Sequence, residues 1–226
     1  MKHDPVIIAL DFDSAAEADA LVGRLGDAAA FYKVGMELYA AAGMDCVRRL
    51  VDRGKRVFLD LKYYDIGETV RRAVAVAARS GATFLTIHSV GQVMRAAIEG
   101  RGDSPMKLLA VSVLTSFDQN DVHELGYDVP LQDLVRDRVH LSMETGVDGI
   151  IGSAVEARAI RAQIGPHMLL VTPGVRSRGA ATGDQKRVAT PAEAVHDGAD
   201  YVVIGRQVSR AADPAAALAA IHAELA

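Results

Sequence analysis

The chain alternates between short apolar runs and longer amphipathic stretches along its whole length. A short apolar run is typical of a buried strand, and apolar positions three and four apart are typical of a helix. The expected strands are Val6–Leu10, Phe31–Val34, Val57–Leu61, Phe84–His88, Leu108–Leu114, Gly149–Gly152, Met168–Thr172 and Tyr201–Ile204. Their helical partners are Ser14–Leu25, Glu37–Asp52, Glu68–Arg79, Gln92–Glu99, Leu131–Thr145, Val155–Ile164, Pro191–His196 and Pro214–Leu225.

The order of these elements predicts an α/β protein with a parallel sheet. Runs such as VIIAL and YVVIG are apolar at every position, which indicates strands buried on both faces. Each strand with its helix fits the roughly 30 residues of a βα unit. Eight units in 226 residues favour a closed (β/α)8 barrel of the TIM type, as a single domain over residues 1–226. A doubly wound open sheet is the alternative, because the period alone does not exclude it.

Two of the expected helices begin with capping residues. Ser14 followed by Glu17 predicts a capping box at the first helix. Thr190 before Pro191 predicts an N-cap with proline in the first turn. Both starts agree with the apolar pattern.

Composition narrows the classes of function. Half of the residues are hydrophobic but only 5% are aromatic, so we expect a core of Val, Ile, Leu and Ala. The net charge of −4 comes without a basic run, which argues against a binder of nucleic-acid polymers or membranes. Cys46 is the only cysteine, so we expect a buried helical residue rather than a disulfide or zinc site. No apolar run approaches the ~20 residues of a membrane span, and we expect a cytoplasmic protein.

Charged residues gather where the expected strands end. In a barrel of this kind, polar side chains at the carboxyl ends of the strands form the functional site. Asp60 and Lys62 are two apart on one strand and would share a face. Asp11, Lys33 and Asp65 could join them in a network that pairs every charge, because an unpaired buried charge costs several kcal/mol. A functional site and a salt-bridge network that only closes the barrel both explain this pattern.

A second set of polar residues lies late in the chain. Gly205 and Arg206 follow the last expected strand, where a helix N-terminus can bind an anion. The segment 172–190 is long for a connection and carries Arg176 and Gln185. We expect this loop to close over a phosphate group. Three further basic residues of the loop better fit solvent-exposed positions: Arg178, Lys186 and Arg187.

The charged segments, taken in order, resemble the orotidine 5′-phosphate decarboxylase family in its short, single-domain bacterial form. DLKYYDIGET at residues 60–69 resembles that family's Asp-x-Lys-x-x-Asp-Ile signature. Further blocks match in the same order: ALDFD at 9–13, YKVGMEL at 32–38, SVLTS at 112–116, TPGVR at 172–176, DQKR at 184–187 and IGRQV at 204–208. The signature departs from the family at Gly67-Glu68, where Pro-Asn is common, and we expect altered backbone freedom at Gly67.

The resemblance implies decarboxylation of orotidine 5′-phosphate to uridine 5′-phosphate, the last step of UMP synthesis, with no metal and no cofactor. Lys62 would protonate the carbon that loses CO2. Asp60, Asp65 and Lys33 would surround Lys62. The other implied nucleotide contacts are Asp11 and Lys33 to the ribose hydroxyls, Thr115 and Ser116 to the pyrimidine, and Arg176, Gln185, Gly205 and Arg206 to the phosphate.

The resemblance also implies a homodimer in which Asp65, Ile66 and Thr69 reach the neighbouring subunit's site. Two other functions stay open at this point. One is a magnesium-dependent sugar-phosphate decarboxylase or synthase on a similar barrel, although the interleaved lysines already neutralise the carboxylates that Mg²⁺ would need. The other is a phosphate-binding protein that has lost catalysis. His88 ends a strand, and it fits both a site residue and a hydrogen-bonded structural histidine.

Overall fold

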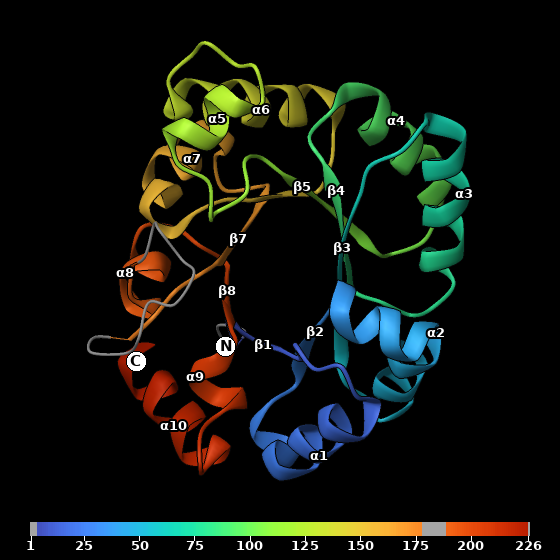
Figure 1. Cartoon of the computed structure of the whole chain (residues 1–226), viewed down its shortest axis with the longest axis vertical. Helices are drawn as coiled ribbons and strands as arrows, with labels where there is room; N and C mark the ends of the chain where they lie inside the picture. The colour runs from blue at the N-terminus through green and yellow to red at the C-terminus, as the bar shows by residue number, and fades with distance from the viewer. Residues whose placement is uncertain (1–3, 178–188, 226) are drawn as a thin grey trace.

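Eight parallel strands close into a barrel in a computed structural model of the protein, which describes residues 4–177 and 189–225 (Figure 1). The strands follow one another around the barrel in chain order, and β8 pairs with β1. They are β1 Val6–Ala9, β2 Phe31–Gly35, β3 Arg56–Tyr63, β4 Phe84–His88, β5 Lys107–Val111, β6 Gly149–Ile151, β7 Leu169–Pro173 and β8 Tyr201–Ile204. All eight expected strands and the single closed barrel are confirmed, and the open sheet is excluded.

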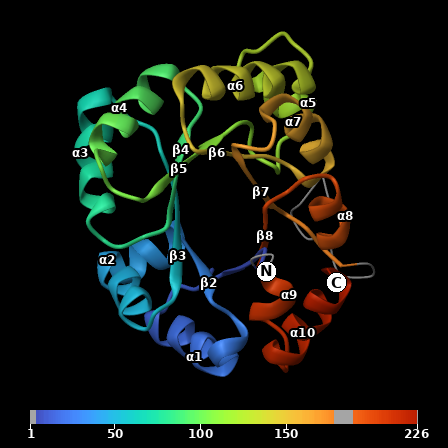
Figure 2. The same ribbon diagram turned by 180° about the vertical axis from the view of Figure 1, so that it is seen from behind.

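Helices form a ring outside the strands, as Figures 1 and 2 show from the two ends. They are α1 Ala15–Leu25, α2 Met36–Asp52, α3 Gly67–Ala78, α4 Gly91–Arg101, α5 Gln119–Glu124, α6 Leu131–Thr145, α7 Ala157–Ile164, α8 Pro191–His196, α9 Arg206–Ser209 and α10 Pro214–Leu225, with 3-10 turns at Gly26–Ala28 and Ala154–Glu156. The short helices α5 and α9 were not expected. A helix of four to six residues is too short to show a helical period in its apolar positions. Within the described residues, no helix is long and apolar enough to cross a membrane.

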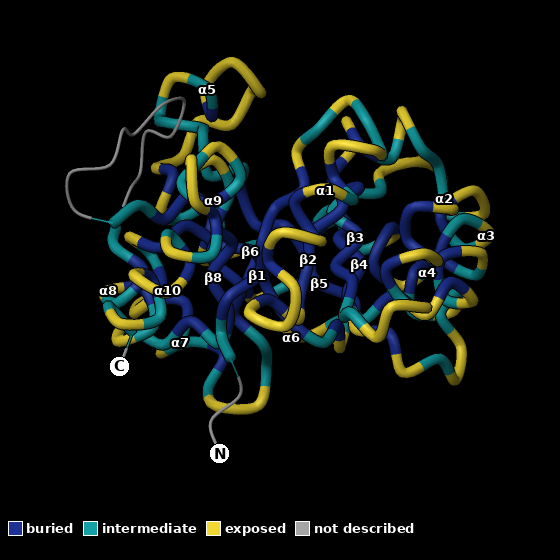
Figure 3. Tube along the Cα trace, turned by 90° about the horizontal axis from the view of Figure 1, so that it is seen from below, coloured by how far each residue is buried: buried dark blue, intermediate teal, exposed yellow. Residues whose placement is uncertain are grey.

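The strands separate two apolar cores. Outward-facing side chains such as Ile8 and Leu59 pack against the helices in a mainly aliphatic cluster, and Figure 3 shows the strands buried inside that shell. The barrel interior differs from the aliphatic core expected from composition, because it concentrates aromatic rings: Phe31, Phe58, Phe84 and Tyr201. The Phe84 ring centroid lies 5.1 Å from that of Phe31 and 5.4 Å from that of Tyr201. A few large rings are enough to fill much of the barrel interior. The low aromatic fraction of the whole chain therefore did not indicate that these rings would gather there.

The helix starts agree only in part with the sequence. Ser14 stands at the N-cap of α1, but its side chain makes no capping hydrogen bond, so the predicted capping box is wrong. Glu17 is exposed, and solvent can satisfy the first-turn amides instead. At α8 the prediction is confirmed, because the Thr190 side chain accepts from the Glu193 amide and Pro191 lies in the first turn.

Candidate active site

An irregularity in β3 creates the centre of the site. β3 pairs with β4 at Leu59↔Leu85 and resumes at Tyr63↔Ile87. Three residues of β3, numbers 60–62, therefore lie opposite the single residue Thr86. Such a bulge re-aims side chains and is common beside active sites. Lys62 lies in this bulge at φ 49°, and it is the one non-glycine residue with positive φ in the described parts of the chain.

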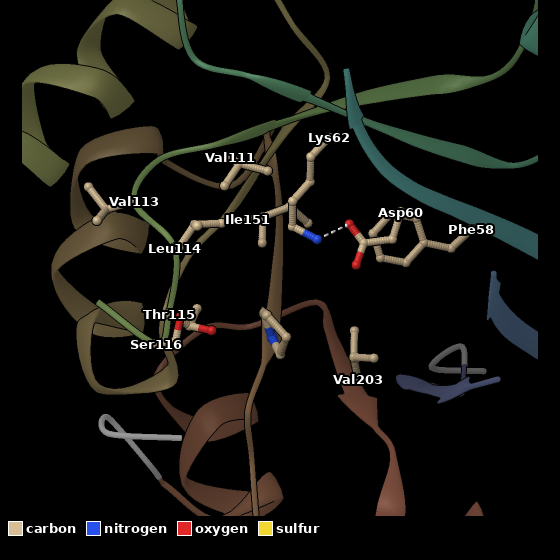
Figure 4. Close-up of a pocket in the computed structure, with 11 residues that line it drawn as sticks. Phe58, Asp60, Lys62, Val111, Val113, Leu114, Thr115, Ser116, Ile151 and Val203 are labelled. Carbon is tan, nitrogen blue, oxygen red and sulfur yellow. Dashed lines mark hydrogen bonds and ion pairs between the residues drawn. The ribbon is translucent and has the colours of Figure 1, made fainter. Parts of the chain in front are cut away.

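Four charged side chains meet at the carboxyl ends of β1, β2 and β3 and alternate in sign. Lys62 Nζ lies 2.7 Å from Asp60 Oδ1, and the two side chains face one another in Figure 4. Lys33 Nζ lies 2.8 Å from Asp11 Oδ1 and 3.7 Å from Asp60 Oδ2. Asp60 and Lys62 thus share a face as expected, although a bulge and not a regular pleat brings them together.

The cluster keeps the central carboxylate ionised. Burial by itself would raise the pKa of Asp60, but Lys33 and Lys62 outweigh it and, with hydrogen bonds from Lys62 and Thr86, lower that pKa below its usual value. Since the Asp60 side chain is only 15% exposed, solvent screens these interactions weakly. The Asp60 carboxylate in turn pairs with the Lys62 ammonium, which lies within hydrogen-bonding distance.

Two residues that the sequence did not single out shape this cluster. Thr86 Oγ1 donates to Asp60 Oδ1 at 3.0 Å and accepts from the Lys62 backbone amide at 2.9 Å. Gly35 leaves the room that the Lys33–Asp11 ion pair occupies, because a Cβ there would lie 2.9 Å from Lys33 Nζ. Thr86 could have been found from its inward phase on β4, two residues before His88.

A cavity of about 230 Å³ opens beside Lys62 and Asp60. Its lining combines these two charges with an apolar wall and two hydroxyl side chains: Phe58, Asp60, Lys62, Val111, Val113, Leu114, Thr115, Ser116, Ile151, Pro173 and Val203. Thr115 and Ser116 lie across the cavity from Asp60 in Figure 4. This lining suits a small, partly polar ring with one edge towards the ammonium group.

A second cavity, of about 420 Å³, adjoins the first and is basic. Pro173 and Val203 line both cavities. The rest of its lining is Ala9, Asp11, Lys33, Glu37, Gly174, Arg176, Gly205, Arg206 and Arg210. The predicted Arg176, Gly205 and Arg206 are therefore brought together, and Arg210 and Glu37 are additions. Gln185, with Arg178, Lys186 and Arg187, lies outside the described residues.

The remaining predicted residues line neither of these cavities: Asp65 and Ile66 lie on the turn after β3, and Thr69 lies in the first turn of α3. Asp65, Ile66 and Thr69 are exposed, and Asp65 Oδ1 accepts from the Ile66 amide at 2.6 Å. Among the described residues Asp65 makes no ion pair with Lys33 or Lys62, so the expected pairing of all five charges is wrong within one chain. The turn is short, because α3 begins at Gly67.

His88 lies beside the site rather than in it. Its ring centroid is 5.3 Å from that of Tyr64. Both residues line a third cavity, of about 420 Å³, together with Tyr127 and Arg138. Burial, helped by Arg138 and Lys62, lowers the pKa of His88 below its usual value, which favours the neutral ring.

Two further expectations concern metals and cysteine. Within residues 4–177 and 189–225, no group of three or more His, Cys, Asp and Glu side chains is placed to hold a metal ion. Cys46 is buried on α2, as expected, and burial raises the pKa of its thiol.

The closed barrel and the charged cavities at the carboxyl ends of its strands define a (β/α)8-barrel enzyme. Residues 4–221 match the orotidine 5′-phosphate decarboxylase / HUMPS family. An orotidine 5′-phosphate decarboxylase of Methylobacterium radiotolerans is 51% identical over 99% of this chain and 97% of its own length. One of Rhodopseudomonas palustris is 51% identical over 99% and 95%. The crystal structure of the Lactobacillus acidophilus enzyme of that name superposes with a TM-score of 0.87 at 35% identity, covering 99% of both chains. The chain belongs to the orotidine 5′-phosphate decarboxylase / HUMPS family.

Proposed function

We propose that the protein converts orotidine 5′-phosphate to uridine 5′-phosphate and CO2. The observation that carries the proposal is the Lys62 ammonium, paired with Asp60 at the wall of a cavity that fits a pyrimidine ring. The relatives that match nearly the whole chain are named orotidine 5′-phosphate decarboxylases. They favour this reaction over that of a sugar-phosphate enzyme on a similar barrel.

The pyrimidine, ribose and phosphate divide between the two adjoining cavities in this proposal. The ring lies against Thr115 and Ser116, which line the first cavity. The ribose hydroxyls meet Asp11 and Lys33, which line the second. The phosphate contacts are Arg176, Gly205 and Arg206 within the described residues, and Gln185 beyond them. Guanidinium groups suit phosphate because they offer paired, permanently charged donors.

Lys62 supplies the decisive charge in the proposed reaction. The bond from the ring carbon to the carboxylate breaks, CO2 leaves, and the electron pair stays on the ring carbon. The ammonium stabilises this developing negative charge and then donates its proton to the same carbon, which leaves a neutral amine. Asp60 holds the Lys62 ammonium in place by their ion pair, and the scheme uses side chains alone.

We also propose a homodimer whose subunits share sites. Asp65, Ile66 and Thr69 then serve the neighbouring subunit, with Asp65 beside that subunit's Lys62. Supporting this, Tyr64 and Ile66 are 67% and 70% exposed in one chain, and a second subunit would cover this apolar surface. The cytoplasmic location expected from the sequence stays a prediction.

The test is turnover of orotidine 5′-phosphate with EDTA present, followed by ultraviolet absorbance. We expect conversion to uridine 5′-phosphate at an undiminished rate. Loss of activity with EDTA would instead favour the magnesium-dependent alternative. An unchanged spectrum from folded protein that still binds the nucleotide would favour the phosphate-binding alternative.

Lys62→Ala tests the assigned proton donor. We expect turnover to fall by at least about 100-fold while uridine 5′-phosphate still binds in calorimetry. Lys107→Ala is the matched control, because Lys107 is an exposed lysine at the amino end of β5, away from the cavities. Near-normal turnover by Lys62→Ala would refute the assignment.

A further inference from the structure

Thr86 lies on β4 next to the charge cluster but lines none of the cavities described above. The residue is 0% exposed, so it is screened from anything bound in the site. It is the single β4 residue that faces the three bulged residues of β3. Any influence of Thr86 on a reaction in the cavity must therefore pass through residues that it contacts.

The Thr86 hydroxyl makes two hydrogen bonds, one to each of the paired residues. Oγ1 accepts from the Lys62 backbone amide at 2.9 Å. The same atom donates to Asp60 Oδ1 at 3.0 Å, the oxygen that also accepts from Lys62 Nζ at 2.7 Å. A hydroxyl suits this position because one atom both donates and accepts.

The bulge explains why such a partner is needed. In a regular parallel ladder the backbone amides of β3 would bond alternately to carbonyls of β2 and of β4. Between Leu59 and Tyr63 that register is interrupted, and the Lys62 amide bonds to a side chain instead. A partly buried amide without a hydrogen-bond partner is unfavourable, so the bond to Thr86 also helps to hold Lys62 at its positive φ.

We propose that Thr86 is a positioning residue for the decarboxylation: its hydroxyl fixes the Lys62 backbone and the Asp60 carboxylate, so that the ammonium points at the reacting carbon. The inference rests on the proposed function, in which Lys62 donates the proton. Removal of the hydroxyl leaves Lys62 and Asp60 in place. It takes away the hydrogen bond to the Lys62 backbone amide and the hydrogen bond to the Asp60 carboxylate. The step that depends on their geometry then slows, while nucleotide binding by the arginines is untouched.

Two matched pairs test the hydroxyl. Thr86 against Thr86→Val, and Thr86→Ser against Thr86→Ala, each differ in one hydroxyl at nearly constant shape. We expect kcat to fall about 10- to 100-fold within each pair when the hydroxyl is lost, as for other residues that orient a reacting group. KM should stay within about twofold, because the phosphate and ribose contacts remain.

Thr172→Val is the control, because Thr172 is also 0% exposed on a barrel strand and donates to the Tyr201 carbonyl at 3.4 Å. It should leave kcat unchanged. If Thr86→Val fails to fold, the serine and alanine variants decide. Equal kcat within the folded pairs would overturn the proposal.

A second measurement needs no activity. Hydrogen exchange of the Lys62 amide, followed by NMR, should be slow in wild type and Thr86→Ser and fast in Thr86→Ala and Thr86→Val. Equal protection in all four proteins would overturn the proposal. Wild-type protein without turnover would contradict the proposed function, and the exchange data would still decide whether the hydroxyl holds Lys62.

Discussion

Lys62 combines an ion pair with a backbone conformation that side chains rarely adopt. Its ammonium is paired with Asp60, and its φ is 49°. For a residue with a Cβ, the left-handed region costs roughly 1–2 kcal/mol relative to the usual regions. The site therefore holds strain at the residue to which we assign the chemistry, as active sites often do.

This strain predicts an order of stability for two variants. Both Lys62→Gly and Lys62→Ala remove the ammonium, but only glycine adopts positive φ without a steric cost. We expect Lys62→Gly to be more stable than Lys62→Ala by about 1 kcal/mol in urea unfolding. A less stable glycine variant would show that the site does not impose the positive φ.

His88 predicts a pH dependence of stability. Burial, then Arg138 and Lys62, lower its pKa in the folded protein below the ordinary 6.5, so the unfolded chain binds the proton more readily. The neutral His88 ring contributes fully to the free energy of unfolding above pH 6.5. This contribution is lost as the pH falls through 6.5 towards the lower pKa of the folded protein. We expect His88→Asn to flatten the fall in unfolding free energy between pH 7 and pH 5. An unchanged slope would mean that other groups cause the fall.

Among the elements, α3 and α4 lie unusually close. A Cβ on Gly100 of α4 would collide with the backbone carbonyl of Arg71 on α3. Short connections join α3 to β3 and α4 to β4, so both helices are tied to strands of the barrel.

The close contact predicts opposite effects of alanine at two helical glycines. Gly100→Ala should destabilise the protein by about 1–3 kcal/mol through overpacking, despite the better helix propensity of alanine. Gly23→Ala in α1 should stabilise it by up to about 1 kcal/mol, since nothing lies within 4 Å of the added Cβ. Urea denaturation measures both. A stabilising Gly100→Ala would show that α3 and α4 can separate at little cost.

At the scale of the whole molecule, barrel closure assembles the site. The first cavity, beside Lys62 and Asp60, is lined by residues of β3, β5, β6, β7 and β8 or of the loops after them. The second, basic cavity adds residues at the ends of β1 and β2. Closure places β8 against β1, which brings Gly205 near Asp11 although the two are far apart in the chain. One chain nevertheless leaves Asp65 outside these cavities.

Shared sites predict complementation between inactive subunits. In a heterodimer of Lys62→Ala and Asp65→Ala chains, one site would be intact and the other would lack both groups. Random association of equal amounts should restore about a quarter of wild-type activity. Lys62→Ala with Lys33→Ala should restore none, because both residues belong to the same subunit's site. No recovery in isolated heterodimers of the first pair would indicate self-contained sites.

The sequence by itself determined the order and phase of the elements. Continuous apolar runs marked all eight strands, since burial on both faces needs no knowledge of the neighbours. Charged residues within those runs or directly after them marked Asp11, Lys33, Asp60 and Lys62, because carboxyl strand ends meet at one side of any such barrel. Only the tertiary structure decided the bulge, the positive φ of Lys62 and the hydrogen bonds of Thr86. These features depend on the pairing of β3 with β4, in which the Lys62 amide donates to a hydroxyl 24 residues away. The local pattern of apolar and polar residues does not specify the register between two strands.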